Sequence, residues 1–219
     1  MIYKQKKVIF LHIYKIAGKS IKNSLIENQD KNLLVNKIYN NTFGYLGYKK
    51  KYLPHQSIEI ERNGELLHSH IRADDYRNYL GDKFDDYFTF TFVRNPFDWQ
   101  VSMYFFMKEQ KNHFQHEIIN NLDFNEYIDW RVNEDFQLQK SFVIDENNEL
   151  IVDFIGKLEN IDHDFNYVQE RLNIKTNLPH VNKSKHKPYY EYFDKRTSNQ
   201  IIEAFEEDFN FFGYEKKLI

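Results

Sequence analysis

A run of apolar residues, followed by apolar residues at helical spacing, opens the chain. Residues 8–13 have the length and composition of a short buried strand. After a turn that contains Gly18, the side chains of Ile21, Leu25 and Ile26 fall on one face of a helix. The pattern therefore predicts a strand, a short turn and an amphipathic helix.

The same succession recurs in the middle of the chain. Residues 87–93 are aromatic and β-branched, as in a strand, and Asn95 followed by Pro96 is the pair expected where a helix begins. We expect this helix to reach about Glu109. Its buried positions should be Val101, Phe105 and Met107. Strand followed by helix, twice, indicates the α/β class, with a mostly parallel central sheet flanked by helices.

The rest of the chain shows weaker patterns of the same kind. Further elements are expected as strands at residues 64–71 and 150–156 and as helices at residues 73–80 and 161–174. Thr197 and Gln200 fit a capping box for one last helix, whose apolar face would hold Ile201, Phe205 and Phe209. Residues 30–60 and 110–140 have no clear period, so we interpret them as substrate loops or irregular helices.

Length, charge and cysteine content narrow the class of protein. A chain of 219 residues has the size of one domain, so we interpret residues 1–219 as a single domain. Its net charge of -3 argues against a general nucleic-acid binder. With no cysteine, the chain can form neither disulfides nor thiolate metal sites, which suits a reducing compartment.

The sequence has no pattern of an export signal or a membrane helix. The apolar run after the N-terminal lysines breaks at His12 and Lys15, which is too early for a signal peptide. No segment approaches the roughly 20 apolar residues of a membrane-spanning helix. We therefore expect a cytoplasmic protein without a membrane span; its oligomeric state is left open.

The turn after the first strand, in FLHIYKIAGKS, has the residues of an anion-binding site. A P-loop for nucleoside triphosphates needs its first glycine where this chain has Ile13. Ala17 and Gly18 let an anion approach the backbone, and Lys15 can reach the same place. The expected N–H donors open the helix and belong to Gly18, Lys19, Ser20 and Ile21. An ordinary strand-to-helix turn with two solvated lysines fits the same residues.

The second turn adds Arg94, at the end of its strand, and Ser102, about two helical turns later. Arginine offers a two-pronged donor for a phosphate, and serine a compact hydroxyl. A structural ion pair for Arg94 and a small helix residue for Ser102 are the alternatives.

Two histidines share one face of the strand expected in LLHSHI. His68 and His70 are two residues apart. Histidine suits the role of a general base because the pKa of its free imidazole is near neutrality. A metal-binding pair, for which no third ligand stands out, and a purely structural pair are the alternatives.

Two segments resemble the motifs of a known family. HIYKIAGKS resembles the 5′-phosphosulfate loop H-I-P-K-T-[AG]-G-T-S of Golgi-type carbohydrate sulfotransferases, and FVRNPFDWQVSMYF resembles their 3′-phosphate motif F-V-R-[ND]-P-[YF]-[DE]-R-x-x-S-x-[YF]. FIGKLENIDHDFNYVQERLNI and LPHVNKSKHKPYYEYFD are similar to later segments, so the likeness spans about residues 8–214. Within the family, hexuronic-acid 2-O-sulfotransferases and their bacterial relatives are the most similar in pattern.

The resemblance implies a P-loop-like three-layer fold and a specific donor, 3′-phosphoadenosine 5′-phosphosulfate (PAPS). It assigns Lys15 and the N–H groups of residues 17–21 to the 5′ end of the donor, and Arg94 and Ser102 to its 3′-phosphate. It makes His70 the base and His68 a supporting group. Ser184 would lie near the nucleotide, in a lysine-rich loop that also holds His180, Lys183, Lys185, His186 and Lys187. The acceptor would be a carbohydrate or a glycolipid, and no metal is expected.

The chain departs from the family motifs at four positions. Tyr14 stands in place of a proline, Ile16 and Lys19 in place of threonines, and Trp99 in place of an arginine. These changes put donor affinity in doubt more than donor identity. Glu159 matches a recurrent family glutamate, which we interpret as a structural ion-pair partner.

Two other functions fit parts of the sequence. A P-loop kinase or NTPase would use Gly18-Lys19-Ser20 and a magnesium-binding Asp153 at a strand end. A non-catalytic module that binds polyanionic glycans would use the lysine-rich loop. Such a lysine run is also typical of a solvated surface.

Overall fold

The computed structural model describes residues 1–3, 6–27, 60–62, 65–67, 70–176, 178 and 186–218. In this part of the chain one mixed sheet has the strand order β1-β2-β5-β6. Its strands are β1 (Ile2–Tyr3), β2 (Val8–Leu11), β5 (Phe88–Val93) and β6 (Phe154–Lys157). Strands β2, β5 and β6 are parallel, and β1 is an antiparallel edge strand. The predicted mostly parallel sheet is confirmed.

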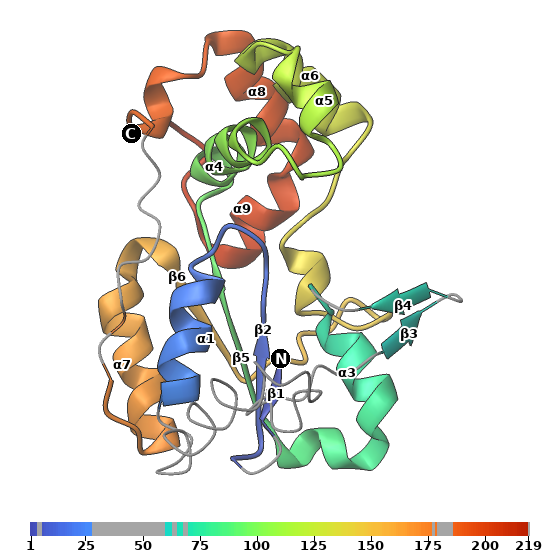
Figure 1. Ribbon diagram of the computed structural model, residues 1–219, viewed down its shortest axis with the longest axis vertical. Coiled ribbons are helices and arrows are strands. Elements are labelled where there is room, and N and C mark those ends of the chain that lie inside the picture. The colour runs from blue at the N-terminus through green and yellow to red at the C-terminus, as the bar shows by residue number, and fades with distance from the viewer. Residues whose placement is uncertain are drawn as a thin grey trace, which may run out of the picture.

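Helices cover both faces of this sheet. Figure 1 shows α1 (Gly18–Glu27) and α7 (Ile161–Leu172) on one side and α3 (Ala73–Leu80) on the other. Ile21 of α1 and Val168 of α7 are fully buried, as is Ala73 of α3. The α/β class with a central sheet between helical layers is therefore confirmed.

The central strand β5 is buried along nearly its whole length, which explains its aromatic composition. Phe90 and Phe92 are 0% and 1% exposed. The rings of Phe10 on β2 and Phe90 on β5 stack at 5.1 Å between centroids. A strand that is covered on both faces needs apolar side chains at successive positions rather than at alternate ones.

Helix α4 (Pro96–Glu109) has the predicted bounds and begins as predicted. The side chain of Asn95 accepts a 3.0 Å hydrogen bond from the N–H of Phe97, which caps the helix. Val101 and Met107 are buried as expected. Phe105 is only half-buried, so that part of the prediction was wrong; its ring instead stacks on the imidazole of His186.

More helices lie beside α4 at the upper end of the molecule in Figure 1, beyond the carboxyl ends of the strands. They are α5 (His116–Asn120), α6 (Phe124–Asn133), α8 (Lys195–Ala204) and α9 (Glu206–Phe212). Residues 110–140 thus contain regular helix rather than only irregular structure. Helix α6 starts at its own capping box, formed by Asp123 and Glu126. One buried apolar cluster continues from the sheet into these helices.

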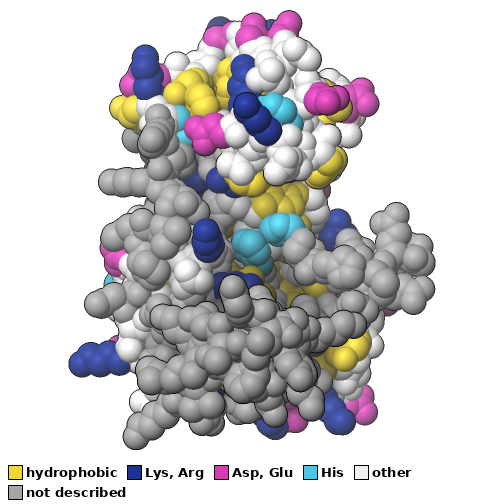
Figure 2. Space-filling model, viewed as in Figure 1, with side chains coloured by type: hydrophobic (Ala, Val, Ile, Leu, Met, Phe, Trp, Pro, Cys, Tyr) yellow, Lys and Arg dark blue, Asp and Glu magenta, His cyan; other side chains and the backbone are white. Residues whose placement is uncertain are grey.

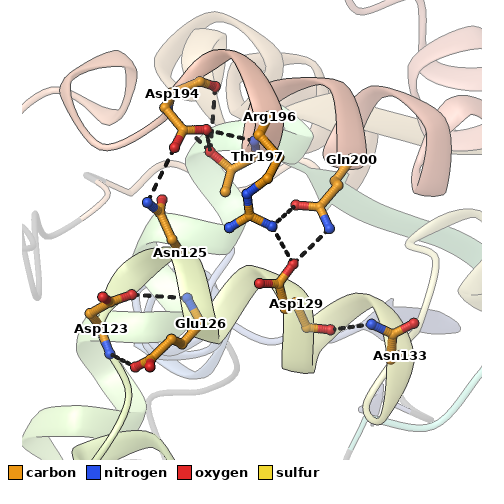
Figure 3. Close-up of polar contacts among 9 residues, drawn as sticks. All are labelled: Asp123, Asn125, Glu126, Asp129, Asn133, Asp194, Arg196, Thr197 and Gln200. Carbon is orange, nitrogen blue, oxygen red and sulfur yellow. Dashed lines mark hydrogen bonds and ion pairs between the residues drawn. The ribbon is translucent and has the colours of Figure 1, made fainter.

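The prediction of a capping box at Thr197 and Gln200 was wrong. Asp194 caps α8, and Thr197 is the third residue of that helix. The N–H of Thr197 donates to the carboxylate of Asp194 at 2.7 Å (Figure 3). Gln200 instead joins Arg196 in binding Asp129 of α6. The expected single helix is also divided, because α8 ends at Ala204 and α9 begins at Glu206. Ile201, Phe205 and Phe209 are all fully buried, as their spacing predicted.

Two other expected strands differ from the prediction. Among the residues of 64–71 that the structure describes, only β4 (Glu65–Leu67) is a strand, and it pairs with β3 (Ile60–Arg62) in a separate antiparallel sheet. Strand β6 begins at Phe154, later than expected. Short 3-10 helices complete the described chain at Gly81–Asp86, Lys140–Phe142, Leu158–Asn160 and Tyr189–Glu191. None of the helices described is long and apolar enough to cross a membrane.

Candidate functional site

Two turns meet at the carboxyl ends of strands β2 and β5. The strands are parallel neighbours, with Leu11 opposite Thr91, so the turns that follow them lie side by side. Nη1 of Arg94, in the second turn, donates a 3.2 Å hydrogen bond to the carbonyl oxygen of Lys15, in the first. The two segments that resemble phosphate-binding motifs are therefore adjacent in space.

The backbone of the first turn is bent by two residues in the left-handed region. The φ angles are 63° at Lys15 and 48° at Ala17. Turns of this kind can gather successive N–H groups around an anion. The N–H of Ile21 donates to the carbonyl of Ala17 at 3.1 Å, so Ile21 is not one of the open donors, contrary to expectation. The N–H groups of Gly18, Lys19 and Ser20 precede that first intrahelical bond.

The lysines of the first turn differ in their surroundings. Nζ of Lys15 lies 4.3 Å from the ring centre of Phe106, and burial together with the charge of Arg94 lowers the pKa of Lys15. Lys19 is exposed, whereas Ser20 is buried. Ile16 is 1% exposed and belongs to the core. Lys15 is therefore the lysine held at the site.

The imidazole of His12, a residue without an expected role, requires a glycine at position 18. A Cβ atom at Gly18 would lie 1.9 Å from ring atoms of His12, so the imidazole occupies the space that a side chain would fill. Burial, and then the neighbouring His70, lower the pKa of His12 to about 3. His12 is therefore neutral and packed against the first residue of α1. Its sequence signal was a histidine that interrupts an apolar strand end.

His70 binds to the same segment. Its Nδ1 lies 2.8 Å from the carbonyl oxygen of His12, and the two imidazole rings are 4.7 Å apart. Because a carbonyl oxygen only accepts, Nδ1 carries the proton and Nε2 of the neutral ring keeps its lone pair. Burial lowers the pKa of His70 below its usual value. His68 lies outside the described residues.

Arg94 is held from several directions. Its Nε donates to Asp98 at 2.8 Å, so the structural ion pair considered from the sequence does form.

Ser102 lies one helical turn beyond Asp98 and is 2% exposed. Its Oγ has no hydrogen-bond partner among the described residues. A buried hydroxyl of this kind normally has a partner, which a bound ligand can supply.

Glu159 stabilises the second turn. One carboxylate oxygen accepts the N–H of Asn95 at 2.6 Å, and the other accepts the hydroxyl of Tyr214 at 2.9 Å. The structural role expected for Glu159 therefore involves a backbone amide and a phenol. No cation pairs with it in the described part of the chain.

Asp153 lies at the amino ends of the parallel strands, which is the wrong end for the expected magnesium role. It precedes β6, and its carboxylate accepts both the N–H and the hydroxyl of Thr89, at 2.7 and 2.8 Å. Thr89 is near the start of β5, whereas Arg94 follows its end. The length of the strands therefore separates Asp153 from the two turns, which follow the carboxyl ends of β2 and β5.

Much of the lysine-rich loop lies outside the described residues, including His180, Lys183, Ser184 and Lys185. Lys187 is exposed and pairs with Glu191 at 3.3 Å. No group of three metal-binding side chains converges within the residues that the structure describes. On the face shown in Figure 2, histidine side chains lie midway along the molecule, with lysine or arginine side chains beside them.

Comparisons with known proteins identify the family of the chain. The sequence model described as "Sulfotransferase family" matches residues 1–215. An uncharacterized protein of Archaeoglobus fulgidus is 32% identical over 105 residues, which cover 47% of this chain and 82% of the archaeal protein. No solved structure matches the chain. Because the family match covers nearly the whole sequence, this chain belongs to the sulfotransferase family.

Proposed function

We propose that this sulfotransferase moves a sulfuryl group from PAPS to a hydroxyl of a carbohydrate or glycolipid acceptor, with His70 as the base. The observation that carries the proposal is the 2.8 Å contact between His70 Nδ1 and the carbonyl oxygen of His12. Since His12 leads directly into the first turn, one segment supports both the base and the anion-binding backbone.

The residues of the two turns fit the two ends of the donor. The opening N–H groups of α1, with Lys15, suit a single 5′-phosphosulfate, which needs less enclosure than a triphosphate. Arg94 keeps N–H donors that Asp98 and the Lys15 carbonyl do not use, and Ser102 has a buried hydroxyl to offer. PAPS would supply the sulfuryl group and leave as adenosine 3′,5′-bisphosphate.

The neutral state of His70 suits removal of a proton. Its Nε2 lone pair can take the proton of the acceptor hydroxyl while the hydroxyl oxygen forms its bond to sulfur. The bond between sulfur and the 5′-phosphate oxygen breaks, and the electron pair stays on that oxygen. The ammonium of Lys15 would stabilise the charge that develops there.

The first experiment compares nucleotide binding by calorimetry. Adenosine 3′,5′-bisphosphate should bind with micromolar affinity, and ATP with magnesium should bind much more weakly. Transfer from labelled PAPS to a panel of glycans would then identify the acceptor. A preference for ATP with magnesium would refute the proposal. Glycan binding that survives replacement of both Lys15 and Arg94, without any nucleotide binding, would indicate a non-catalytic module instead.

A further inference from the structure

Two buried side chains that take no part in the proposed chemistry connect the last helix to Arg94. Gln139 and Asp208 are both 0% exposed. Gln139 immediately precedes the 3-10 helix Lys140–Phe142, and Asp208 lies in α9. Neither residue has a local sequence pattern that indicates a role at the site.

The side-chain amide of Gln139 completes the backbone hydrogen bonding of Arg94. Its Oε1 accepts the N–H of Arg94 at 2.9 Å, and its Nε2 donates to the carbonyl oxygen of Arg94 at 2.8 Å. The pairing between β5 and β6 ends at Val93. A side-chain amide carries both a donor and an acceptor, so it can substitute for a neighbouring strand over one residue.

Asp208 holds the segment from which Gln139 extends. One carboxylate oxygen accepts the N–H of Gln139 at 2.9 Å, and the other accepts the N–H of Lys140 at 2.8 Å. These two bonds fix the backbone at the start of the 3-10 helix. The hydrogen bonds therefore run without interruption from Asp208 through Gln139 to Arg94.

The two ends of Arg94 are thus fixed by different parts of the fold. Asp98 and the Lys15 carbonyl hold the guanidinium group, while Gln139 holds the backbone. An arginine that is already ordered loses less conformational freedom when it binds a ligand. Its affinity for a phosphate should therefore depend on Gln139 as well as on its own charge.

We propose that Gln139 is a positioning residue that fixes Arg94 for the 3′-phosphate of the donor, and that Asp208 holds Gln139 in place. This inference rests on the proposed function, because it concerns the same donor site. A positioning role differs from a purely structural one in one measurable respect: loss of Gln139 should weaken binding of the 3′-phosphate specifically.

The test compares two probes, adenosine 3′,5′-bisphosphate and adenosine 5′-monophosphate, which lacks the 3′-phosphate. Gln139→Met keeps the length of the side chain and removes both hydrogen bonds to Arg94. It should weaken bisphosphate binding about tenfold, the factor that corresponds to roughly 1.4 kcal/mol. Binding of the monophosphate should change less than twofold. In an Arg94→Ala background, Gln139→Met should cause no further loss.

Gln169→Met is the matched control. Gln169 also accepts a backbone N–H, that of Thr176 at 2.8 Å, but it lies in the last turn of α7, away from the carboxyl ends of the strands. It should leave binding of both probes unchanged. Equal losses for the two probes in Gln139→Met, or an undiminished loss in the Arg94→Ala background, would overturn the inference.

A second variant covers the case in which Gln139→Met does not fold. Asp208→Asn preserves side-chain shape but turns one accepting oxygen into an NH2 group that faces a backbone N–H. It should weaken bisphosphate binding more than monophosphate binding, and equal effects would count against the inference. If the wild-type chain binds neither probe, the proposed function fails and the inference fails with it. Wild-type binding with unselective variants refutes the inference alone.

Discussion

Trp99 Nε1 donates a 2.9 Å hydrogen bond to the carbonyl oxygen of Tyr14, and the two rings stack at 5.6 Å between centroids. Both residues depart from the family motifs that the chain otherwise resembles. Trp99 is fully buried, and the rings of Tyr14 and His70 are nearly perpendicular, with their centroids 4.9 Å apart. The two departures are therefore coupled, because the indole holds the backbone of the turn that leads to Lys15.

Replacing Trp99 with phenylalanine should destabilise the protein. The variant keeps an aromatic ring but leaves the Tyr14 carbonyl without its donor, which costs about 1–3 kcal/mol for a buried group. Urea unfolding measures this free energy. Trp130→Phe is the control, because Trp130 is half-buried on α6 and contacts Tyr127 through its ring. Equal effects of the two variants would show that ring size, not the hydrogen bond, matters.

Replacing Gly18 with alanine should disturb the base through His12. The new Cβ would overlap the His12 imidazole, and overpacking of this kind costs about 1–3 kcal/mol. Because the carbonyl of His12 binds His70, sulfuryl transfer should fall together with stability. Urea unfolding and the transfer assay measure the two effects.

His12→Ala provides the control for this prediction. Without the imidazole, alanine at position 18 has space, so Gly18→Ala should cost less stability in the His12→Ala background than in the wild type. Additive costs would contradict the steric explanation and indicate that the glycine is required for the backbone conformation itself.

The sequence predicted elements with a strong local pattern and missed contacts between distant segments. Strand β5 and the bounds of α4 follow from an aromatic run and from Asn95-Pro96, which are local signals. The Thr197 error had a local cause as well, since Asp194 and Thr197 repeat the same spacing one turn earlier. The link between Gln139 and Arg94 spans 45 residues, and no local pattern reveals it.

Histidine NMR of the free protein tests the state of His70. The hydrogen bond to the His12 carbonyl should keep the proton on Nδ1, and burial should place the pKa below the usual 6.5. A folded pKa that is lower than the unfolded one means that this part of the stability is present above about pH 6.5 and is lost on acidification. Nitrogen shifts that place the proton on Nε2, or a midpoint above 6.5, would contradict the prediction.

Asp208 should give the opposite pH dependence. Burial raises its pKa from 3.8 to about 6, although the N–H groups of Lys140 and Gln139 oppose this shift. Between these values the folded state holds a proton that the unfolded state has lost, so stability falls as pH rises. Relative to Asp208→Asn, the wild type should lose about 2 kcal/mol between pH 4 and 6.5, measured by urea unfolding. A difference that stays constant with pH would refute this prediction.

Separate variants should distinguish the base from the group that binds the leaving phosphate. His70→Asn retains a side-chain donor near the His12 carbonyl but has no basic nitrogen, so it should bind adenosine 3′,5′-bisphosphate within about twofold of wild type. Its turnover should fall by about 10²–10⁴, the contribution typical of general-base catalysis. Lys15→Met keeps an apolar side chain of similar length but removes the ammonium, whose Nζ lies 4.3 Å from the ring centre of Phe106, so both binding and turnover should fall. Calorimetry and transfer from labelled PAPS measure the two effects. If His70→Asn keeps full turnover, the base lies elsewhere; if Lys15→Met loses turnover alone, Lys15 acts only after the donor has bound.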